Sequence, residues 1–504
     1  MSVSEAPSTT LQDAGPLLSF TYARRHGVLL LRDTQGELHG HFRATASRGA
    51  LAEAQRRAGG PIRWHGAEEG EFDSLLNQAF EREGSAARQM VEDLGDAFDL
   101  AALANDVPET EDLLDQETEA PIIRLLNAIL SEAIREDASD IHLETFDHTL
   151  AVRFRIDGVL REIVRPKRAL APLLVSRLKV MAKLDIAEKR VPQDGRISLR
   201  VAGREVDVRV STLPTASGER VVLRLLDKQA GRLELEKLGM APEVLATLKE
   251  VVRRPHGIVL VTGPTGSGKT TTLYAALSTL DTHSANVMTV EDPIEYHLPG
   301  IGQTQVNSKA QLTFARGLRA ILRQDPDVVM VGEIRDLETA EIAIQAALTG
   351  HLVLSTLHTN SALGAIARLR DLGVESYLLA SSLSAVLAQR LVRRLCTHCK
   401  AAVPADSRTR ELLGLEEGAQ GATVFEARGC EACAGTGYRG RTGIYELVSI
   451  DGALSQLIHD DAPAQQLAAQ AGRGQGTRFE DGKRKILAGE TTLTEVLRVT
   501  RDEG

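Results

Sequence analysis

The chain has 504 residues, of which 43% are hydrophobic and 25% charged, and a formal net charge of −10. This composition is typical of a water-soluble globular protein with about three domains. The acidic balance argues against a general nucleic-acid binder. No apolar stretch approaches the ~18 residues that cross a bilayer, and the first thirty residues lack the basic start and apolar block of a secretory signal. We expect a cytoplasmic protein that reaches a membrane only through partners.

The N-terminal region, residues 1–88, carries the pattern of a small α/β module. A strand-like apolar run covers 27–31, and helix-like stretches cover 50–58 and 72–81. The pattern predicts a separate small domain at this end of the chain.

An acidic segment follows this module. From Gln89 to Ile123 the chain contains eleven Asp and Glu residues and no Lys, Arg or His. Runs of like charge repel one another and are usually solvated. We therefore expect an acidic linker over 89–120, with an acidic interaction segment as the alternative.

Residues 121–227 predict an α+β domain. Pro121 opens an amphipathic helix, because Pro favours the first turn and apolar residues then recur at helical spacing. Apolar and polar residues alternate over 150–156 and over 205–210, as they do in half-buried strands. The segment 169–184 between them has a helical pattern.

Arginines are concentrated in the second half of this domain. Seven occur between residues 190 and 224: Arg190, Arg196, Arg200, Arg204, Arg209, Arg220 and Arg224. A solvated sheet face is the plain explanation. The alternative is a positive surface that binds the triphosphate of a neighbouring domain, because Arg is permanently charged and binds phosphate bidentately. Arg209 and Arg224 are the preferred candidates, and Arg220 is the third.

The strongest motif is a phosphate-binding loop. Residues 263–270 read Gly-Pro-Thr-Gly-Ser-Gly-Lys-Thr and follow a buried strand pattern at 257–262. Glycines let several N–H groups point at one anion, and the helix that follows adds its positive end. Lys269 can reach the β- and γ-phosphates, and the Thr270 hydroxyl can bind Mg²⁺. The residues expected to bind the nucleotide are Gly263, Pro264, Thr265, Gly266, Ser267, Gly268, Lys269, Thr270 and Thr271.

Acidic residues and a histidine follow three further apolar runs. Glu333 ends one such run, and a carboxylate at that place can orient the attacking water in phosphate-loop ATPases. Glu291 and Glu295 follow another run and can contact metal or water. His358 follows a third run, where it either senses the γ-phosphate or is an ordinary half-buried side chain. The weaker candidates are Asp327, Asp336 and His351.

These motifs share one predicted sheet. Strands beginning near 257, 287, 327 and 352 alternate with helical stretches, which predicts a mainly parallel, doubly wound sheet. Ligands of such sheets bind at the carboxyl ends of the strands, where the motifs lie. We assign the ATPase core to 237–395 and a hinge linker to 228–236.

Four cysteines form two Cys-x-x-Cys pairs, at Cys396, Cys399, Cys430 and Cys433. Four thiolates satisfy a tetrahedral Zn²⁺, so we expect a structural zinc subdomain over 396–433. Redox pairs or idle thiols are the alternative. The remaining residues, 434–504, are expected to form a mostly helical C-terminal subdomain.

Several segments resemble the secretion ATPases of the type II secretion and type IV pilus superfamily over residues 120–450. The matching segments are 137–144, 191–196, the phosphate loop, 290–293, 333–336, 356–358 and 441–446. The tetracysteine insert resembles the assembly ATPases of this superfamily and not its pilus retraction ATPases. The short N-terminal region is most similar to the general secretory pathway protein E family of type II secretion systems.

This resemblance implies a RecA-like ATPase domain preceded by a PAS-like α+β domain. It implies a homo-hexamer in which ATP lies between the arginine-bearing domain and the ATPase core. Glu291 and Glu295 fall in the family's aspartate box, Glu333 in its Walker B element and His358 in its histidine box. Arg319 and Arg323 lie before Walker B and are further candidates to line the nucleotide. ATP, Mg²⁺ and Zn²⁺ are the implied cofactors.

The function implied is ATP hydrolysis that drives pseudopilus assembly and protein export. The expected partners are a bitopic inner-membrane protein, which binds the N-terminal module, and a polytopic platform protein. A type IV pilus extension ATPase is the closest alternative. A nucleic-acid translocase and a non-catalytic nucleotide-gated scaffold are alternatives from other classes, and we expect no nucleic-acid partner.

Overall fold

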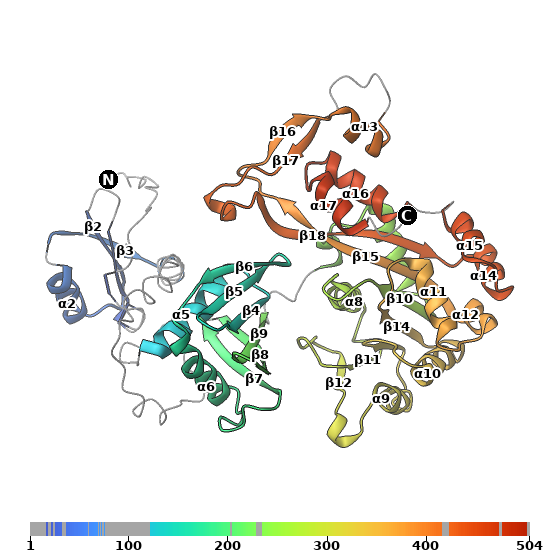
Figure 1. The fold of residues 1–504 in the computed structure, drawn as a ribbon, viewed down its shortest axis with the longest axis horizontal. Helices are drawn as coiled ribbons and strands as arrows, with labels where there is room; N and C mark the ends of the chain where they lie inside the picture. The colour runs from blue at the N-terminus through green and yellow to red at the C-terminus, as the bar shows by residue number, and fades with distance from the viewer. Residues whose placement is uncertain are drawn as a thin grey trace. The chain divides into compact units, whose positions relative to one another are not determined.

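The computed structural model describes residues 17–18, 22–23, 26–32, 37–58, 60–68, 70, 72, 75, 121–201, 204–227, 234–415, 423–472 and 476–500. The predicted acidic linker and most of the predicted hinge lie outside these residues. The chain divides into two compact units, residues 1–229 and 230–504 (Figure 1). None of the described helices is both long and apolar enough to span a lipid bilayer.

A three-stranded sheet forms the N-terminal module. Its strands β1 (Val28–Arg32), β2 (Leu38–Arg43) and β3 (Ile62–Ala67) lie in that order, with β1 and β2 antiparallel and β2 and β3 parallel. Helix α2 (Arg48–Ala58) packs its buried alanines against the apolar residues of β1. The strand predicted at 27–31 and the helix predicted at 50–58 are therefore confirmed, whereas most of the helix predicted at 72–81 lies outside the described residues.

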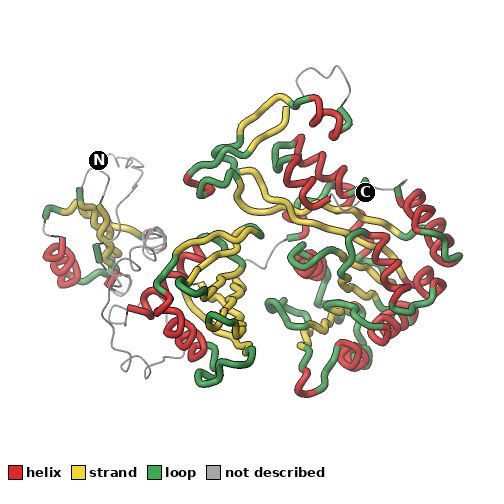
Figure 2. Tube along the Cα trace, viewed as in Figure 1, coloured by secondary structure: helices red, strands yellow, loops and turns green. Residues whose placement is uncertain are grey.

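The second sheet has six antiparallel strands in the order β6-β5-β4-β9-β8-β7. Its elements are α5 (Pro121–Arg135), β4 (Asp140–Thr145), β5 (Leu150–Ile156), β6 (Val159–Val164), η2 (Arg168–Leu170), α6 (Ala171–Met181), β7 (Gln193–Val201), β8 (Arg204–Thr215) and β9 (Gly218–Asp227). Helices α5 and α6 bury their apolar faces against one side of this sheet (Figure 2). The predicted helix at Pro121 and strand at 150–156 are confirmed, and the polar face of the sheet carries the arginines.

The third sheet has seven strands in the order β12-β11-β13-β14-β10-β15-β18. All neighbours in it are parallel except β15 and β18. Its strands are β10 (Gly257–Thr262), β11 (Val287–Glu291), β12 (Gly302–Gln305), β13 (Val328–Val331), β14 (Leu352–Leu357), β15 (Leu383–Leu395) and β18 (Tyr438–Ser449). The mainly parallel sheet predicted from the four apolar runs is thus confirmed.

Helices cover both faces of this sheet, because its central strands are apolar on both sides. One face packs against α9 (Phe314–Ile321), α10 (Leu337–Leu348), α11 (Ala362–Asp371), α12 (Ser376–Ser382), α14 (Gly452–His459) and α15 (Ala464–Ala471). The other packs against η3 (Leu235–Leu238), α7 (Pro242–Val251) and α8 (Lys269–Leu277). A short helix, η4 (Ser308–Ala310), lies between β12 and α9.

The cysteine segment is inserted between two paired strands of this sheet. Its elements are β16 (Ala401–Pro404), α13 (Ser407–Leu413), β17 (Thr423–Glu426) and η5 (Glu431–Cys433), and they lie between β15 and β18 in the chain (Figure 1). Strand β18 falls in the segment that we expected to be mostly helical. Its pairing with β15 makes residues 438–449 an edge strand of the ATPase sheet, a long-range pairing that local patterns did not indicate.

Helix α16 (Arg478–Leu487), which is followed by the last helix, α17 (Leu493–Thr500), and strand β18 hold the beginning of the second unit. Lys485 is fully buried, and its Nζ donates to Gly239 O at 2.7 Å and to Thr442 Oγ1 at 2.9 Å. The Tyr445 hydroxyl donates to Leu238 O at 3.1 Å. Leu238 and Gly239, which follow the hinge segment, are therefore fixed to β18 and to α16.

Candidate functional site

The phosphate loop lies between a fully buried strand and a helix. Strand β10 ends at Thr262, and α8 begins at Lys269. Gly263, Gly266 and Gly268 have φ values of 152°, 79° and 87°, a backbone region that favours glycine. The loop can therefore curl so that its N–H groups and the positive end of α8 face one anion. Thr270 is half-buried in the first turn of this helix.

Lys269 is the buried cation of this loop. Its Nζ donates to Gly263 O at 2.8 Å and to Pro264 O at 3.1 Å. Burial lowers the pKa of Lys269 to about 8, an effect that nearby Glu333 opposes and Arg390 reinforces. The ammonium group is still mostly protonated at neutral pH, and its electrostatic interaction with Glu333 places these two predicted residues in one site.

Glu333 and His358 follow neighbouring parallel strands, β13 and β14. His358 Nε2 lies 3.3 Å from Glu333 Oε2, and Arg335 donates to the other carboxylate oxygen. Burial, followed by the charge of Lys269, lowers the pKa of His358 below its usual range. His358 is therefore neutral at pH 7, and its Nε2–H can donate to Glu333.

Glu291 ends β11 but is 2% exposed, and its carboxylate is bonded within the protein. It accepts hydrogen bonds from the Tyr274 hydroxyl, from Thr289 Oγ1 at 2.5 Å and from Gln303 Nε2 at 3.1 Å. Burial raises the pKa of Tyr274, and the Glu291 carboxylate raises it further, so Tyr274 remains a donor. Since Tyr274 belongs to α8, this carboxylate connects β11 and β12 to the helix of the phosphate loop.

Glu295 follows the Asp292–Pro293 cis peptide bond and is half-buried. Its backbone N donates to the Tyr274 hydroxyl at 3.3 Å. The predicted metal or water contact of the Glu291 and Glu295 carboxylates stays a prediction. The hydrogen bonds of the Glu291 carboxylate show a structural role, since they join β11 to β12 and to α8.

Three weaker candidates have structural bonds outside the site. Asp327 precedes β13 and His351 precedes β14, so both lie at the amino ends of their strands, opposite the phosphate loop. Asp327 Oδ2 accepts from Asn286 N at 2.7 Å, and the His351 ring nitrogen lies 2.9 Å from Ala346 O. Asp336 caps α10 by accepting from Thr339 N at 2.8 Å.

Arg319 and Arg323 lie at the end of α9 and just after it. Arg319 forms an ion pair with Glu338 at 2.6 Å, and Arg323 Nη1 donates to Arg319 O at 2.9 Å. Both side chains are exposed. Their predicted contact with the nucleotide stays a prediction.

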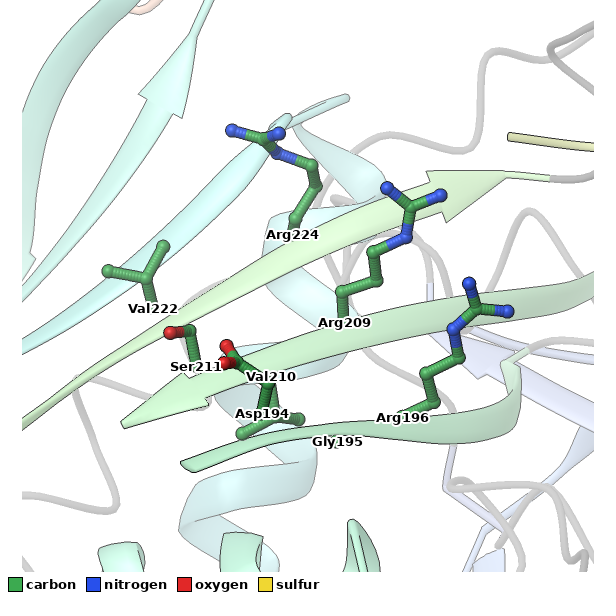
Figure 3. A pocket seen from close by; sticks show the side chains of 8 residues that line it. All are labelled: Asp194, Gly195, Arg196, Arg209, Val210, Ser211, Val222 and Arg224. Carbon is green, nitrogen blue, oxygen red and sulfur yellow. The ribbon is translucent and has the colours of Figure 1, made fainter. Parts of the chain in front are cut away.

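The arginines of the first unit form a row across its sheet. Arg196 on β7 is paired in register with Arg209 on β8, which is paired with Arg224 on β9. All three line an open pocket of about 420 Å³, and their guanidinium groups extend from the same face (Figure 3). This arrangement brings the two preferred arginines together and adds Arg196, which the sequence pattern did not distinguish from the other arginines.

Acidic residues of β4 hold two of the arginines. Arg224 Nε donates to Asp140 Oδ1 at 3.0 Å. Arg220 forms an ion pair with buried Glu144 at 2.5 Å and lies 3.3 Å from His142 Nδ1. Burial is the main cause of the lowered pKa of His142, and Arg155 adds to it. Residues of β4 therefore hold both Arg220 and Arg224, but only Arg224 lines the pocket, together with Arg209.

The four cysteines form one cluster, and within the described residues it is the only group of this kind suited to a metal. The Sγ atoms of Cys396 and Cys430 are 3.9 Å apart, and Cys433 Sγ lies 3.8 Å from both Cys399 and Cys430. Zn–S bonds of ~2.3 Å at tetrahedral angles place sulfur atoms about 3.8 Å apart. The spacing excludes disulfides and fits a closed tetrahedral zinc site.

Backbone N–H groups favour the thiolate form within this cluster. Cys430 N and Gly437 N lie 3.2 and 3.1 Å from Cys433 Sγ. Burial acts to raise the pKa of the Cys433 thiol, but these donors, together with hydrogen bonds from the thiols of Cys430 and Cys399, outweigh it and lower the pKa to about 6. Since metals bind the thiolate, the donor set fits Zn²⁺.

Two residues of β15 lie beside the site although no motif pointed to them. Gln389 is 1% exposed and is hydrogen-bonded to the phosphate loop and to α8. Arg390 Nη2 donates to Oδ1 of Asn360 at 3.1 Å, and Asn360 lies two residues after His358 in the chain. Both follow an apolar run, and only the pairing of β15 with β10 places them here.

Comparison with known proteins identifies the family. A family described as type II/IV secretion system protein matches residues 115–498, and a family for an N-terminal domain of GSPII protein E matches residues 17–80. The chain belongs to the type II/IV secretion system protein family. Within this family it is 62% identical over 486 residues to type II secretion system protein E of Pseudomonas aeruginosa, covering 96% of each chain.

A further relative and a solved structure agree with this family. The chain is 55% identical over 487 residues to type II secretion system ATPase E of Vibrio cholerae, covering 96% of this chain and 97% of that protein. The structure of the pilus retraction motor PilT with bound ADP has a TM-score of 0.51 and 29% identity, and covers 74% of this chain and 95% of that one. The resemblance inferred from the motifs and the RecA-like fold are therefore confirmed.

Proposed function

We propose that the chain is the ATP-hydrolysing motor of a type II secretion system. The observation that carries this proposal is one site in which the phosphate loop, Lys269, Glu333 and His358 meet at the carboxyl ends of parallel strands. Such a site can bind a nucleoside triphosphate through backbone N–H groups and Lys269. Glu333 can orient the attacking water, because phosphoryl transfer depends mainly on positioning and charge. The chain's family supports the same chemistry.

Arg209 and Arg224 are proposed to bind the triphosphate from the first unit. Their row of guanidinium groups offers several charge-assisted hydrogen bonds to an anion of extended shape. ATP binding would then draw the two units together, and hydrolysis would release them. The hinge linker at 228–236 would absorb the motion, since the residues just after it are held by Lys485 and Tyr445.

Membership of this family implies oligomerisation and contact with other secretion components. We propose a homo-hexamer in which sequential closure pushes on a polytopic platform protein and adds pseudopilin subunits. The N-terminal module would bind the cytoplasmic domain of a bitopic membrane protein. The motor would thus be cytoplasmic and peripheral to the inner membrane.

Two metal ions are part of this proposal. The four cysteines would hold Zn²⁺, which stabilises the inserted subdomain and takes no part in hydrolysis. Thr270 would bind Mg²⁺, which neutralises charge on the phosphates. Metal analysis of the purified chain tests the first assignment: one zinc per chain is expected, and its loss in Cys399→Ser would support it, whereas a zinc-free wild-type chain would contradict it.

The alternative of a pilus extension ATPase is less supported, because the similar proteins are named for type II secretion. A nucleic-acid translocase remains opposed by the net charge of −10 and the sparse aromatic residues. The non-catalytic scaffold is opposed by the presence of Lys269 and Glu333.

ATP hydrolysis by the assembled full chain tests the proposed function. Turnover should depend on Mg²⁺ and should be lost in Lys269→Ala. The matched control is Lys309→Ala, which removes an exposed lysine of η4 and should leave turnover unchanged. Near-normal hydrolysis by Lys269→Ala would contradict the catalytic assignment.

A further inference from the structure

We propose that Gln389 is a positioning residue that sets the orientation of the Ser267–Gly268 peptide in the phosphate loop. The inference rests on the proposed nucleotide binding by that loop, and it adds to the site a residue from outside every motif. Gln389 touches none of the reacting atoms. It acts through the loop that receives the phosphates.

The pairing of β10 with β15 brings Gln389 to the loop. Thr262, the last residue of β10, is paired in register with Ala388, so the next residue of β15 lies level with the first residue of the loop. The side chain is 1% exposed and belongs to the buried interior. A primary amide in this position must find partners, because an unbonded buried polar group costs about 1–3 kcal/mol.

The nitrogen and the oxygen of the Gln389 side-chain amide both form hydrogen bonds with one short segment of the chain. Gln389 Nε2 donates to Ser267 O at 2.6 Å, and Gln389 Oε1 accepts from Thr272 Oγ1 at 2.8 Å. Ser267 belongs to the loop, and Thr272 belongs to the first turn of α8. One side chain therefore ties the loop to the helix that follows it.

The bond to Ser267 fixes the direction of the next N–H. In a planar trans peptide the C=O and N–H groups point in opposite directions. Since Ser267 O points toward Gln389 on β15, the N–H of Gly268 points away from that strand. An N–H held in this way costs no reorganisation when a phosphate binds, which is how preorganised donors favour anions.

Gln389 also packs closely against two glycines of the loop. A Cβ placed on Gly263 would lie 2.6 Å from Gln389 O, and one placed on Gly268 would lie 3.1 Å from Gln389 Nε2. Gln389 therefore contacts both the first residue of the loop and the residue before Lys269. These contacts leave little room for the loop to rearrange.

Only an amide satisfies both partners at neutral pH. A Met side chain has a similar length but cannot donate to Ser267 O. An ionised Glu accepts from Thr272 but places a carboxylate oxygen against Ser267 O. A protonated Glu carries one O–H donor, so protonation restores the pattern of bonds that Gln makes.

The test is the affinity of the full chain for a fluorescent ATP analogue with Mg²⁺, measured across pH 6 to 8. Gln389→Met should bind about tenfold more weakly at every pH, because it loses the donor to Ser267 O and the amide acceptor for Thr272 Oγ1. Gln389→Glu should bind more weakly still at pH 8 and should recover affinity relative to wild type as pH falls. Burial raises the pKa of such a carboxyl group, which brings its protonation into this range.

Thr272→Val and Val386→Ala complete the set. Thr272→Val keeps the side-chain shape and removes only one hydroxyl, so it should fold and weaken binding about threefold. Val386 lies on the same strand as Gln389 and is fully buried on the sheet face opposite to α8. Val386→Ala should lower the melting temperature without changing nucleotide affinity.

Three results would overturn the inference. One is unchanged affinity in Gln389→Met and Thr272→Val. Another is a loss of affinity in Val386→Ala equal to that in Gln389→Met at the same loss of stability. The third is a Gln389→Glu variant whose affinity relative to wild type does not change with pH. If wild type binds ATP but does not hydrolyse it, the proposed function fails while this inference can still hold.

Discussion

Glu333 and His358 come from adjacent parallel strands, and their Oε2 and Nε2 atoms lie 3.3 Å apart. The pairing orients the Glu333 carboxylate from one side, while Arg335 binds it from the other. Buried Lys269 interacts electrostatically with both Glu333 and His358. A change in the charge of one of these groups therefore changes the electrostatic environment of the others. We expect nucleotide hydrolysis at the loop to depend on all of them.

Glu333→Gln should lower turnover about 100-fold or more while leaving nucleotide affinity within a few-fold of wild type. The amide keeps the shape of the side chain but cannot accept a proton from water, and general-base contributions are typically of this size. Steady-state hydrolysis and analogue binding are the two measurements. The control is Glu341→Gln, which removes an exposed carboxylate of α10. Full turnover in Glu333→Gln would exclude Glu333 as the water-orienting residue.

His358 should titrate below its ordinary value of ~6.5. Burial and Lys269 lower its pKa, so the unfolded chain binds a proton more readily than the folded chain. This contribution to stability is fully present above the ordinary value and is lost as the pH falls toward the folded pKa. NMR titration of labelled histidine measures the midpoint. A midpoint above 6.5 would show that the Glu333 carboxylate outweighs burial.

Arg209→Ala and Arg224→Ala should each lower turnover about 100-fold, as expected when one preorganised donor to a charged transition state is lost. Melting temperatures should change little, because the Arg224 side chain is 56% exposed and buried Asp140 keeps its contacts with Arg155 and Ser139 when Arg224 is removed. Arg165→Ala is the control, since Arg165 follows the edge strand β6 and pairs with Glu162. Arg196→Ala should show an intermediate loss. Full activity in both Arg209→Ala and Arg224→Ala would refute a role for this row.

Lys485→Met should destabilise the second unit by about 3 kcal/mol, because it removes the buried donor to Thr442 Oγ1 and one of the two donors to Gly239 O, the other being Arg484 Nη2. Burial lowers the pKa of Lys485, as expected for an ammonium group removed from water. Denaturant unfolding of the full chain measures the change. Lys483→Met on the same helix should change stability by less than about 0.5 kcal/mol. Equal effects of the two substitutions would contradict the anchoring role of Lys485.

The sequence predicted much of the fold because its signals are local. The phosphate loop is a contiguous motif, and the runs at β10, β11, β13 and β14 have the apolar character of buried parallel strands. The place of β18 was not predictable in this way, because its pairing with β15 spans the whole cysteine insert. Gln389 was missed for the same reason, since nothing near it in the chain shows that β15 lies beside β10.

The burial of Glu291 could not be predicted from the sequence either. A carboxylate at the end of a strand pattern can face either solvent or a neighbouring helix, and only the packing of Tyr274 and Gln303 decides which. The arginines show the opposite case. Strand alternation put Arg209 and Arg224 on the polar face, and the register between strands then placed Arg196 beside them.

The most direct test of the central claim is the distance between the two units in each nucleotide state. Spin labels attached without cysteine chemistry at exposed Ser198 and Ser308 report this distance, and excess unlabelled chain limits each ring to one labelled copy. The account predicts a shorter distance with a non-hydrolysable ATP analogue than with ADP, and no such shortening in Lys269→Ala. The same distribution of distances with the analogue, with ADP and without nucleotide would contradict it.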